Sequence, residues 1–201
     1  MLELIKNIPN INMYPLKYVF EVMNLKHKAD TLWLEFGVYS GRTINYISSF
    51  TEDNVYGFDS FEGLPEKWRD GFDKGAFSTG GNVPTNINKN VILVKGWFND
   101  TLIPFITSEN KKISFIHIDV DLYSSTKYIL NTLKNYFDKE CVIVFDELVN
   151  YPGFDGDTGE LKAFYEFINE NDVKYEWIGM NGEPFNMIGY EHENVAVIIY
   201  K

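Results

Sequence analysis

The sequence predicts a doubly wound α/β fold: a seven-stranded, mostly parallel sheet with a last antiparallel strand and helices on both faces. Short apolar runs alternate with amphipathic segments along the 201 residues, which favours a parallel sheet. The last two runs are joined by a segment too short and too broken by Gly and Pro for a helix, which indicates an antiparallel pair. With 45% apolar residues and no linker or internal repeat, residues 1–201 are expected to form one Rossmann-like domain.

Seven apolar runs are the predicted strands. They cover residues 31–38, 54–60, 90–98, 113–119, 141–147, 174–179 and 194–201. In a sheet of this class the fourth and fifth strands are parallel neighbours, so their carboxyl ends meet at one edge. Ligands of such folds bind beyond the carboxyl ends of the central strands.

Apolar residues recur with helical spacing in three segments. In the N-terminal segment, residues 1–30, they are Leu16, Val19, Phe20 and Met23. Between the fourth and fifth strands they are Ile129, Leu130, Leu133, Tyr136 and Phe137, and after the fifth strand they are Leu161, Phe164, Tyr165 and Ile168. Each segment is expected to be a helix that packs on the sheet.

Composition excludes several classes of partner. The net charge is −11 and the basic residues form no cluster, so nucleic acid is not expected as a partner. No apolar run approaches the roughly 20 residues that span a bilayer, and no signal peptide is evident, so we expect no membrane association and a cytoplasmic location. The single cysteine, Cys141, lies in an apolar run and is expected to be core.

The first strand leads into the glycine-bearing turn "EFGVYSGRT", which contains Glu35, Gly37 and Gly41. Glycines let the backbone turn sharply and approach a ligand, although many strand-to-helix turns carry them without a ligand. Asp59 ends the second strand, where an acid accepts hydrogen bonds from ribose hydroxyls in nucleoside-binding folds. The spacing is not G-x-G-x-x-G, so S-adenosylmethionine, which has no phosphate, fits better than NAD.

Four acids end two neighbouring strands. Asp119 and Asp121 follow the fourth strand, and Asp146 and Glu147 follow the fifth. Unpaired buried charges are costly, and such a group of oxygen ligands suits a hard divalent cation, most simply Mg²⁺. The alternative is a set of helix-capping and solvated acids. Of the three histidines, His117 is expected to be a hydrogen-bonded core residue, His192 to be able to reach the pocket, and His27 to lie on the surface.

Five ordered stretches between about residue 31 and residue 168 resemble the macrocin O-methyltransferase family of class I S-adenosylmethionine-dependent methyltransferases. They are "LEFGVYSGRT", "VYGFDSFEGLP", "VKGWFNDTL", "FIHIDVDLYSST" and "VIVFDELVNYPG". The resemblance implies that the methyl donor is held by Glu35, Gly37, Ser40, Gly41, Asp59, Ser60 and Phe61, with Trp97 near the adenine; Tyr39 of the same turn completes the expected set.

The resemblance also implies a metal site made by Asp119, Asp146 and Glu147. Related catechol-type enzymes often carry a lysine base three residues after the first ligand, where this chain has Leu122. Deprotonation of the acceptor is therefore assigned to Asp119, with the metal alone or a group outside the motif as alternatives.

A long connection, residues 61–90, contains five glycines after Phe61 together with Trp68, Phe72 and Phe77. Connections of this size are commonly lids or binding loops, so we expect it to cover the acceptor. The alternative is a poorly patterned helix followed by a surface excursion. Residues 150–160 are expected either to rim the site or to form turns.

These observations predict a Mg²⁺-assisted O-methyltransferase that acts on a hydroxyl of a sugar or a sugar-containing small molecule. The sugar class rests on the resemblance alone. The alternatives are a non-catalytic module that binds S-adenosylmethionine or another nucleoside, and an NAD-linked oxidoreductase. A homo-oligomer is a further expectation that the sequence leaves open.

Overall fold

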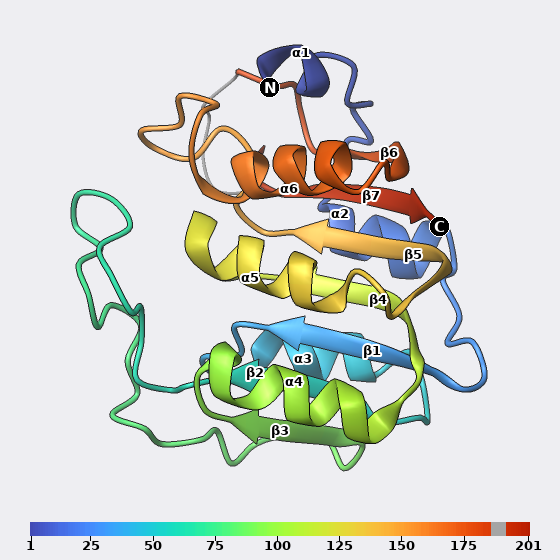
Figure 1. The fold of residues 1–201 in the computed structure, drawn as a ribbon, viewed down its shortest axis with the longest axis vertical. Helices are drawn as coiled ribbons and strands as arrows, with labels where there is room; N and C mark the ends of the chain where they lie inside the picture. The colour runs from blue at the N-terminus through green and yellow to red at the C-terminus, as the bar shows by residue number, and fades with distance from the viewer. Residues whose placement is uncertain (186–191) are drawn as a thin grey trace.

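A computed structural model describes residues 1–185 and 192–201, and a seven-stranded sheet forms its centre (Figure 1). The strands are β1 (Thr31–Phe36), β2 (Val55–Asp59), β3 (Val91–Lys95), β4 (Lys112–Ile118), β5 (Phe137–Phe145), β6 (Lys174–Met180) and β7 (Val195–Tyr200). Their order is β3-β2-β1-β4-β5-β7-β6. Strand β7 runs antiparallel to both of its neighbours, β5 and β6. The other neighbouring strands pair in parallel. The predicted sheet is confirmed, and all seven strands lie at or near their expected positions.

Helices cover both faces of the sheet, as predicted. They are α1 (Leu2–Ile5), α2 (Pro15–Lys17) with the π-helical turn η1 (Tyr18–Val22), α3 (Arg42–Ser48), α4 (Phe98–Glu109), α5 (Tyr123–Leu133) and α6 (Gly159–Glu170). Helices α4, α5 and α6 cover one face of the sheet, and α2, η1 and α3 cover the other (Figure 1). The apolar side chains of the first group share one core with the sheet, and those of the second group share another. Cys141 is buried in the first core, as expected. Among the described residues, no helix is long and apolar enough to cross a membrane.

Two helical expectations are wrong at their ends. Helix α5 ends at Leu133, and Phe137 instead begins β5 and pairs with Ile113 of β4. Its ring is buried and packs edge-on against Phe167, with centroids 5.8 Å apart, so its apolar character serves the sheet rather than the helix. The N-terminal helix ends at Val22, and Met23 is exposed.

The connection between β2 and β3, teal in Figure 1, stands at the end of the sheet toward which β1 and β5 point. Residues 61–90 contain no helix, so the helical alternative is wrong. The segment closes on itself through two backbone hydrogen bonds, from the Leu64 amide to the Ala76 carbonyl and from the Gly75 amide to the Leu64 carbonyl, both 2.9 Å long. It is therefore a folded excursion at the edge where ligands of this fold class bind.

The strand order reverses between β1 and β4, because β2 and β3 extend the sheet on one side and β5 on the other. Backbone pairing continues just past the strand ends. The Asp119 amide donates to the Phe36 carbonyl at 2.9 Å, and the Asp146 amide donates to the Ile118 carbonyl at 2.8 Å. This pairing holds Asp119 and Asp146 side by side at the carboxyl edge.

Candidate active site

A cavity of about 430 Å³ lies at the carboxyl ends of the parallel strands, a volume in the range of small-molecule sites. One part of its wall comes from the turn after β1 and the ends of β2 and β3, including Gly37, Asp59 and Trp97. The opposite part comes from the ends of β4 and β5, including Asp119 and Glu147. Residues from the 61–90 segment complete the lining. The cavity thus joins the predicted donor site to the predicted metal site.

Gly37 has a packing reason to be glycine. Its φ of +84° favours glycine, and a Cβ at this position would lie 1.8 Å from the carbonyl oxygen of Asp119. The glycine therefore lets the chain leaving β1 pass directly against the chain leaving β4. The same contact brings the donor turn beside the first of the predicted metal ligands.

Asp59 organises the turn that carries Gly37. Its Oδ2 accepts hydrogen bonds from the amides of Val38 and Tyr39, both at 2.8 Å, and its Oδ1 accepts one from the amide of Phe61 at 2.7 Å. The carboxylate also lines the cavity. Since a carboxylate offers about four acceptor positions, Asp59 keeps capacity for a ligand hydroxyl while it fixes the loops around it.

The residues of the predicted donor set divide into those that line the cavity and those that do not. Gly37, Tyr39, Asp59, Ser60 and Trp97 line the cavity. Ser40 is exposed beside it, Gly41 precedes α3, Phe61 packs in the apolar core under α3, and Glu35 is fully buried. Gly41 too has a packing role, because a Cβ there would lie 2.4 Å from the side chain of Ile87.

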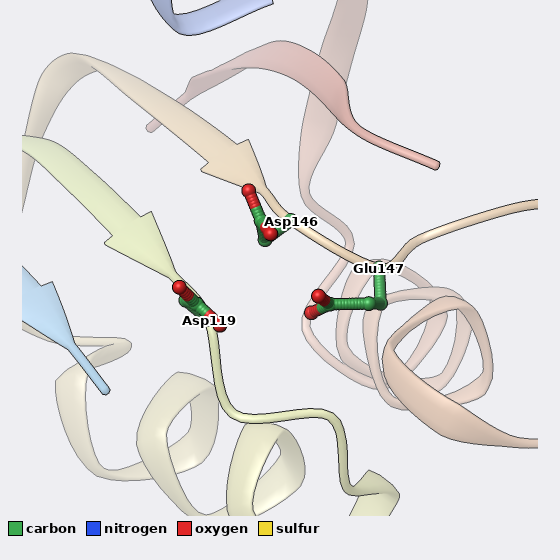
Figure 2. Close-up of side chains that lie close together, drawn as sticks. All are labelled: Asp119, Asp146 and Glu147. Atoms are coloured by element: carbon green, nitrogen blue, oxygen red, sulfur yellow. The ribbon is translucent and has the colours of Figure 1, made fainter. Parts of the chain in front are cut away.

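Asp119, Asp146 and Glu147 form one cluster, as the sequence predicted. Figure 2 shows their carboxylates pointing toward one another from the ends of β4 and β5. One oxygen from each lies within 4.8 Å of the others, close to the spread of about 4.2 Å across an octahedral Mg²⁺ shell. Burial, reinforced by the neighbouring Asp146 carboxylate, raises the pKa of both Asp119 and Glu147.

The donor chemistry of this cluster fits a hard cation. All three side chains offer oxygen, which Mg²⁺ prefers. Oε2 of Glu147 is buried without a hydrogen-bond partner among the described residues. Such an orphaned oxygen is costly unless it binds a proton or a cation. The three residues could therefore hold Mg²⁺.

Asp146 is held in place by groups from distant parts of the chain. Its Oδ1 accepts hydrogen bonds from the Tyr14 hydroxyl at 2.9 Å and from Nδ2 of Asn194 at 2.6 Å. Nε2 of His117 lies 3.7 Å away, an ion-pair distance longer than a hydrogen bond. Burial raises the pKa of Asp146, but the imidazole of His117 and the hydroxyl of Tyr14 outweigh it and lower the pKa. No sequence motif pointed to Tyr14 or Asn194.

His117 links the two halves of the site beneath the cavity. It is fully buried, and its Nδ1 lies 3.0 Å from Oε1 of Glu35, so the expected hydrogen-bonded core histidine is confirmed. Burial by itself lowers the pKa of His117, but the carboxylates of Asp146 and Glu35 outweigh it and raise the pKa to about 10. The two carboxylates therefore favour the protonated imidazole, while burial raises the pKa of Glu35 in spite of its contact with His117. In this position Glu35 serves the framework of the site.

The other two histidines lie away from the cluster. The His27 side chain is mostly buried and packs at a tilt against Trp33, with ring centroids 5.1 Å apart, and its Nδ1 lies 3.1 Å from the Asp53 carboxylate. The expectation of a surface histidine is therefore wrong, because packing against Trp33 covers the ring. Nδ1 of His192 lies 2.8 Å from the carbonyl oxygen of Asn181, and His192 is not among the residues that line the cavity.

The 61–90 segment supplies an aromatic and cationic wall. Leu64, Trp68, Phe72 and Phe77 line the cavity, and so does Arg69, whose guanidinium lies 4.2 Å from the Trp68 ring centroid and 4.5 Å from that of Phe72. Tyr151 of the expected rim at residues 150–160 is buried against Trp68, with centroids 5.8 Å apart. The sequence singled out the aromatic residues but not Arg69.

Two further acids were missed as site residues. Glu193 lines the cavity, and Glu160 lies buried behind the cluster, where its carboxylate accepts long hydrogen bonds from the amides of Val120 and Glu147 at 3.5 and 3.4 Å. Burial raises the pKa of Glu160 well above its ordinary value. Glu160 stands in the first turn of α6, where an acid would ordinarily be explained by the helix dipole.

The fold and the site define a class of protein: a Rossmann-like methyltransferase. The chain belongs to the family whose model is described as a methyltransferase domain and matches residues 34–148, more than half of its length. No curated protein matches the sequence.

Several solved structures share the fold. The calicheamicin methyltransferase CalS11 is 20% identical with a TM-score of 0.58, covering 84% of this chain and 72% of that chain. The O-methyltransferase NovP is 20% identical with a TM-score of 0.55, covering 83% of this chain and 70% of that chain. An O-methyltransferase from Bacillus cereus in complex with SAH is 17% identical with a TM-score of 0.57, covering 97% of this chain and 85% of that chain. At these identities the similarity shows a common fold.

Proposed function

We propose that this protein is an S-adenosylmethionine-dependent O-methyltransferase that uses Mg²⁺ and methylates a hydroxyl of a sugar or sugar-containing small molecule. The observation that carries the proposal is the cluster of Asp119, Asp146 and Glu147, of which Asp119 and Glu147 line a cavity whose other wall is the glycine-bearing turn held by Asp59. Donor and acceptor sites would then share one cavity, as methyl transfer requires.

The donor end would hold the ribose and the amino acid portion of S-adenosylmethionine. Asp59 has acceptor capacity left for a ribose hydroxyl, and the half-exposed indole of Trp97 offers a flat apolar surface for the adenine. The first turn carries no phosphate-binding glycine pattern, which favours this donor over a dinucleotide.

The acceptor hydroxyl would lie at the carboxylate cluster. Bound Mg²⁺ would supply Lewis acidity, which lowers the pKa of the hydroxyl. Asp119 would receive the proton of the hydroxyl, because its carboxyl group lies at the cavity wall within the cluster. The oxygen then forms a bond to the methyl carbon as the carbon–sulfur bond of the sulfonium breaks, leaving S-adenosylhomocysteine. Asp146, fixed by Tyr14 and Asn194, would position the site without moving a proton.

Two observations support a sugar acceptor: the resemblance to macrocin O-methyltransferases, and the substrate named for one protein of similar structure. One structure of CalS11 is described as a TDP-rhamnose 3'-O-methyltransferase. The 61–90 segment would cover such an acceptor, since it brings several aromatic side chains to the cavity wall.

The test is methyl transfer to a panel of hydroxylated glycosides, with and without excess chelator. We expect chelation to abolish product formation, Mg²⁺ to restore it, and Asp146→Asn to reduce kcat at least about 100-fold while donor binding by calorimetry persists. Full activity in excess chelator would refute the metal role and leave Asp119 as an ordinary base. Binding of S-adenosylmethionine without its consumption on any acceptor would favour the non-catalytic module.

A further inference from the structure

Beside the carboxylate cluster, the cavity wall carries a second group of charged side chains that the methyl-transfer chemistry does not use. They are Arg69 from the 61–90 segment, Asp121 from the turn after β4 and Glu193 from the segment before β7. Asp121 and Glu193 are only 6% and 4% exposed. Three chain segments far apart in sequence therefore bring these groups to one cavity.

The two carboxylates have unused acceptor capacity. No side chain or backbone group of residues 1–185 and 192–201 donates a hydrogen bond to the carboxylate of Asp121 or of Glu193. No lysine, arginine or histidine of the described chain lies within 4.0 Å of either one. A buried carboxylate without a hydrogen-bond partner is energetically costly. These two carboxylates therefore favour a ligand that carries hydrogen-bond donors.

Arg69 has unused donor capacity. Its guanidinium lies over the rings of both Trp68 and Phe72, and its Nε is buried without a partner within the described part of the chain. Burial raises the pKa of Glu193 to about 7, and the nearby positive charge of Arg69 opposes this rise. Arg69 and Glu193 thus influence each other across a gap that neither closes.

The chemistry of this gap selects the ligand. A second metal ion there would lie beside the guanidinium of Arg69, which cannot act as a ligand and is the one cationic side chain among the described residues of the lining. An added anion would be repelled by Asp121 and Glu193. A neutral hydroxyl avoids both penalties, because it accepts a hydrogen bond from the guanidinium and donates one to a carboxylate. Two or three hydroxyls on one small frame would satisfy all three residues at once.

We propose that Arg69, Asp121 and Glu193 form the acceptor subsite, which binds adjacent hydroxyl groups of a neutral, polyhydroxylated ring. This assignment rests on the proposed function and names the residues that select its substrate. Phe77 is 43% exposed at the cavity, and its ring would pack against the apolar C–H face of the same ring. The hydroxyl to be methylated would then point to Asp119.

Ligand binding without turnover tests the subsite. We would measure saturation transfer by NMR to methyl α-mannopyranoside, methyl α-glucopyranoside and methyl α-rhamnopyranoside, with glucose 1-phosphate and glucosamine as the anionic and cationic arms. Arg69→Gln and Glu193→Gln should each weaken binding of the neutral glycosides at least fivefold. The matched control is Lys67→Gln, which removes the same charge from the same segment at an exposed residue that pairs with Asp70. Circular dichroism confirms that each variant is folded.

The possible outcomes distinguish a failure of the proposed subsite from a failure of the proposed function. Glycoside binding that depends on Arg69 and Glu193, without methyl transfer, supports the subsite and counts against the proposed function. Methyl transfer whose acceptor kcat/KM is the same in wild type, Arg69→Gln and Glu193→Gln overturns the subsite and keeps the function. Binding of glucose 1-phosphate or glucosamine at least tenfold tighter than the neutral glycosides also overturns it, as does a wild type that binds no glycoside.

Discussion

The hydroxyl of Tyr14 donates a 2.9 Å hydrogen bond to Oδ1 of Asp146, across 132 positions of the sequence. Tyr14 immediately precedes α2, while Asp146 directly follows β5. The contact makes the N-terminal segment part of the carboxylate cluster. Burial and the carboxylate of Asp146 raise the pKa of Tyr14, so it remains a donor throughout the usual pH range.

Replacement of Tyr14 by Phe should weaken divalent-metal binding about 10-fold to 100-fold, the range for losing a partner of a ligating residue. Mn²⁺ binding, followed by electron paramagnetic resonance, measures this without turnover. Tyr18→Phe in the adjacent turn is the matched control. If Asp146→Asn abolishes Mn²⁺ binding and Tyr14→Phe leaves it unchanged, Tyr14 has no positioning role; if neither variant matters, the metal site itself is wrong.

Asp59→Asn should lower the affinity for S-adenosylhomocysteine by about 1.5–3 kcal/mol, the range for hydrogen bonds to a charged group. Because Asp59 also accepts from the amides of Val38, Tyr39 and Phe61, the variant should lose folding stability as well. Calorimetry with S-adenosylhomocysteine and with its 2',3'-dideoxy analogue separates the two effects. A ribose contact predicts that removing the hydroxyls costs the wild type more than the variant, and equal losses would assign Asp59 to the turn alone.

Gly37→Ala should destabilise the fold by about 3 kcal/mol or more, because the new methyl group would lie 1.8 Å from the Asp119 carbonyl oxygen. Gly71→Ala provides a control for backbone strain, since its φ is +87° but nothing lies within 4 Å of the added Cβ. That variant should cost only about 1–2 kcal/mol. Urea unfolding measures both, and equal losses would contradict the packing explanation.

His117 should make the metal-free protein less stable as the pH rises. Its folded pKa is raised to about 10 by Asp146 and Glu35 against the opposing effect of burial, whereas the unfolded value is about 6.5. Its stabilisation is therefore complete below about pH 6.5 and is lost progressively as the pH rises to about 10, by at most about 1.4 kcal/mol per pH unit for one proton.

Urea unfolding in chelator at pH 6.5, 7.5 and 8.5 tests this sign. The difference in the free energy of unfolding between wild type and His117→Gln should shrink as the pH increases. A difference that grows with pH would mean that His117 is neutral in the fold.

The sequence by itself determined the parts of this protein that depend on local pattern. Alternating apolar runs predicted the seven strands, and the rule that parallel neighbours end at one edge predicted that Asp119 would meet Asp146 and Glu147. Local pattern failed where one residue suits two elements: Phe137 continues the helical spacing of α5, yet its pairing with Ile113 makes it the start of β5.

Tertiary structure alone decided which distant residues reach the cavity. Tyr14, Arg69 and Asn194 carry no motif, and they became site residues because the N-terminal segment, the 61–90 segment and the approach to β7 all close over the carboxyl edge. Gly37 shows the same division. The sequence marked it as a glycine of a ligand-binding turn, and only the contact with Asp119 shows why a side chain is forbidden there. Steric contacts and hydrogen-bond partners depend on which residues lie close together in space, whereas a sequence pattern shows only which residues are close along the chain.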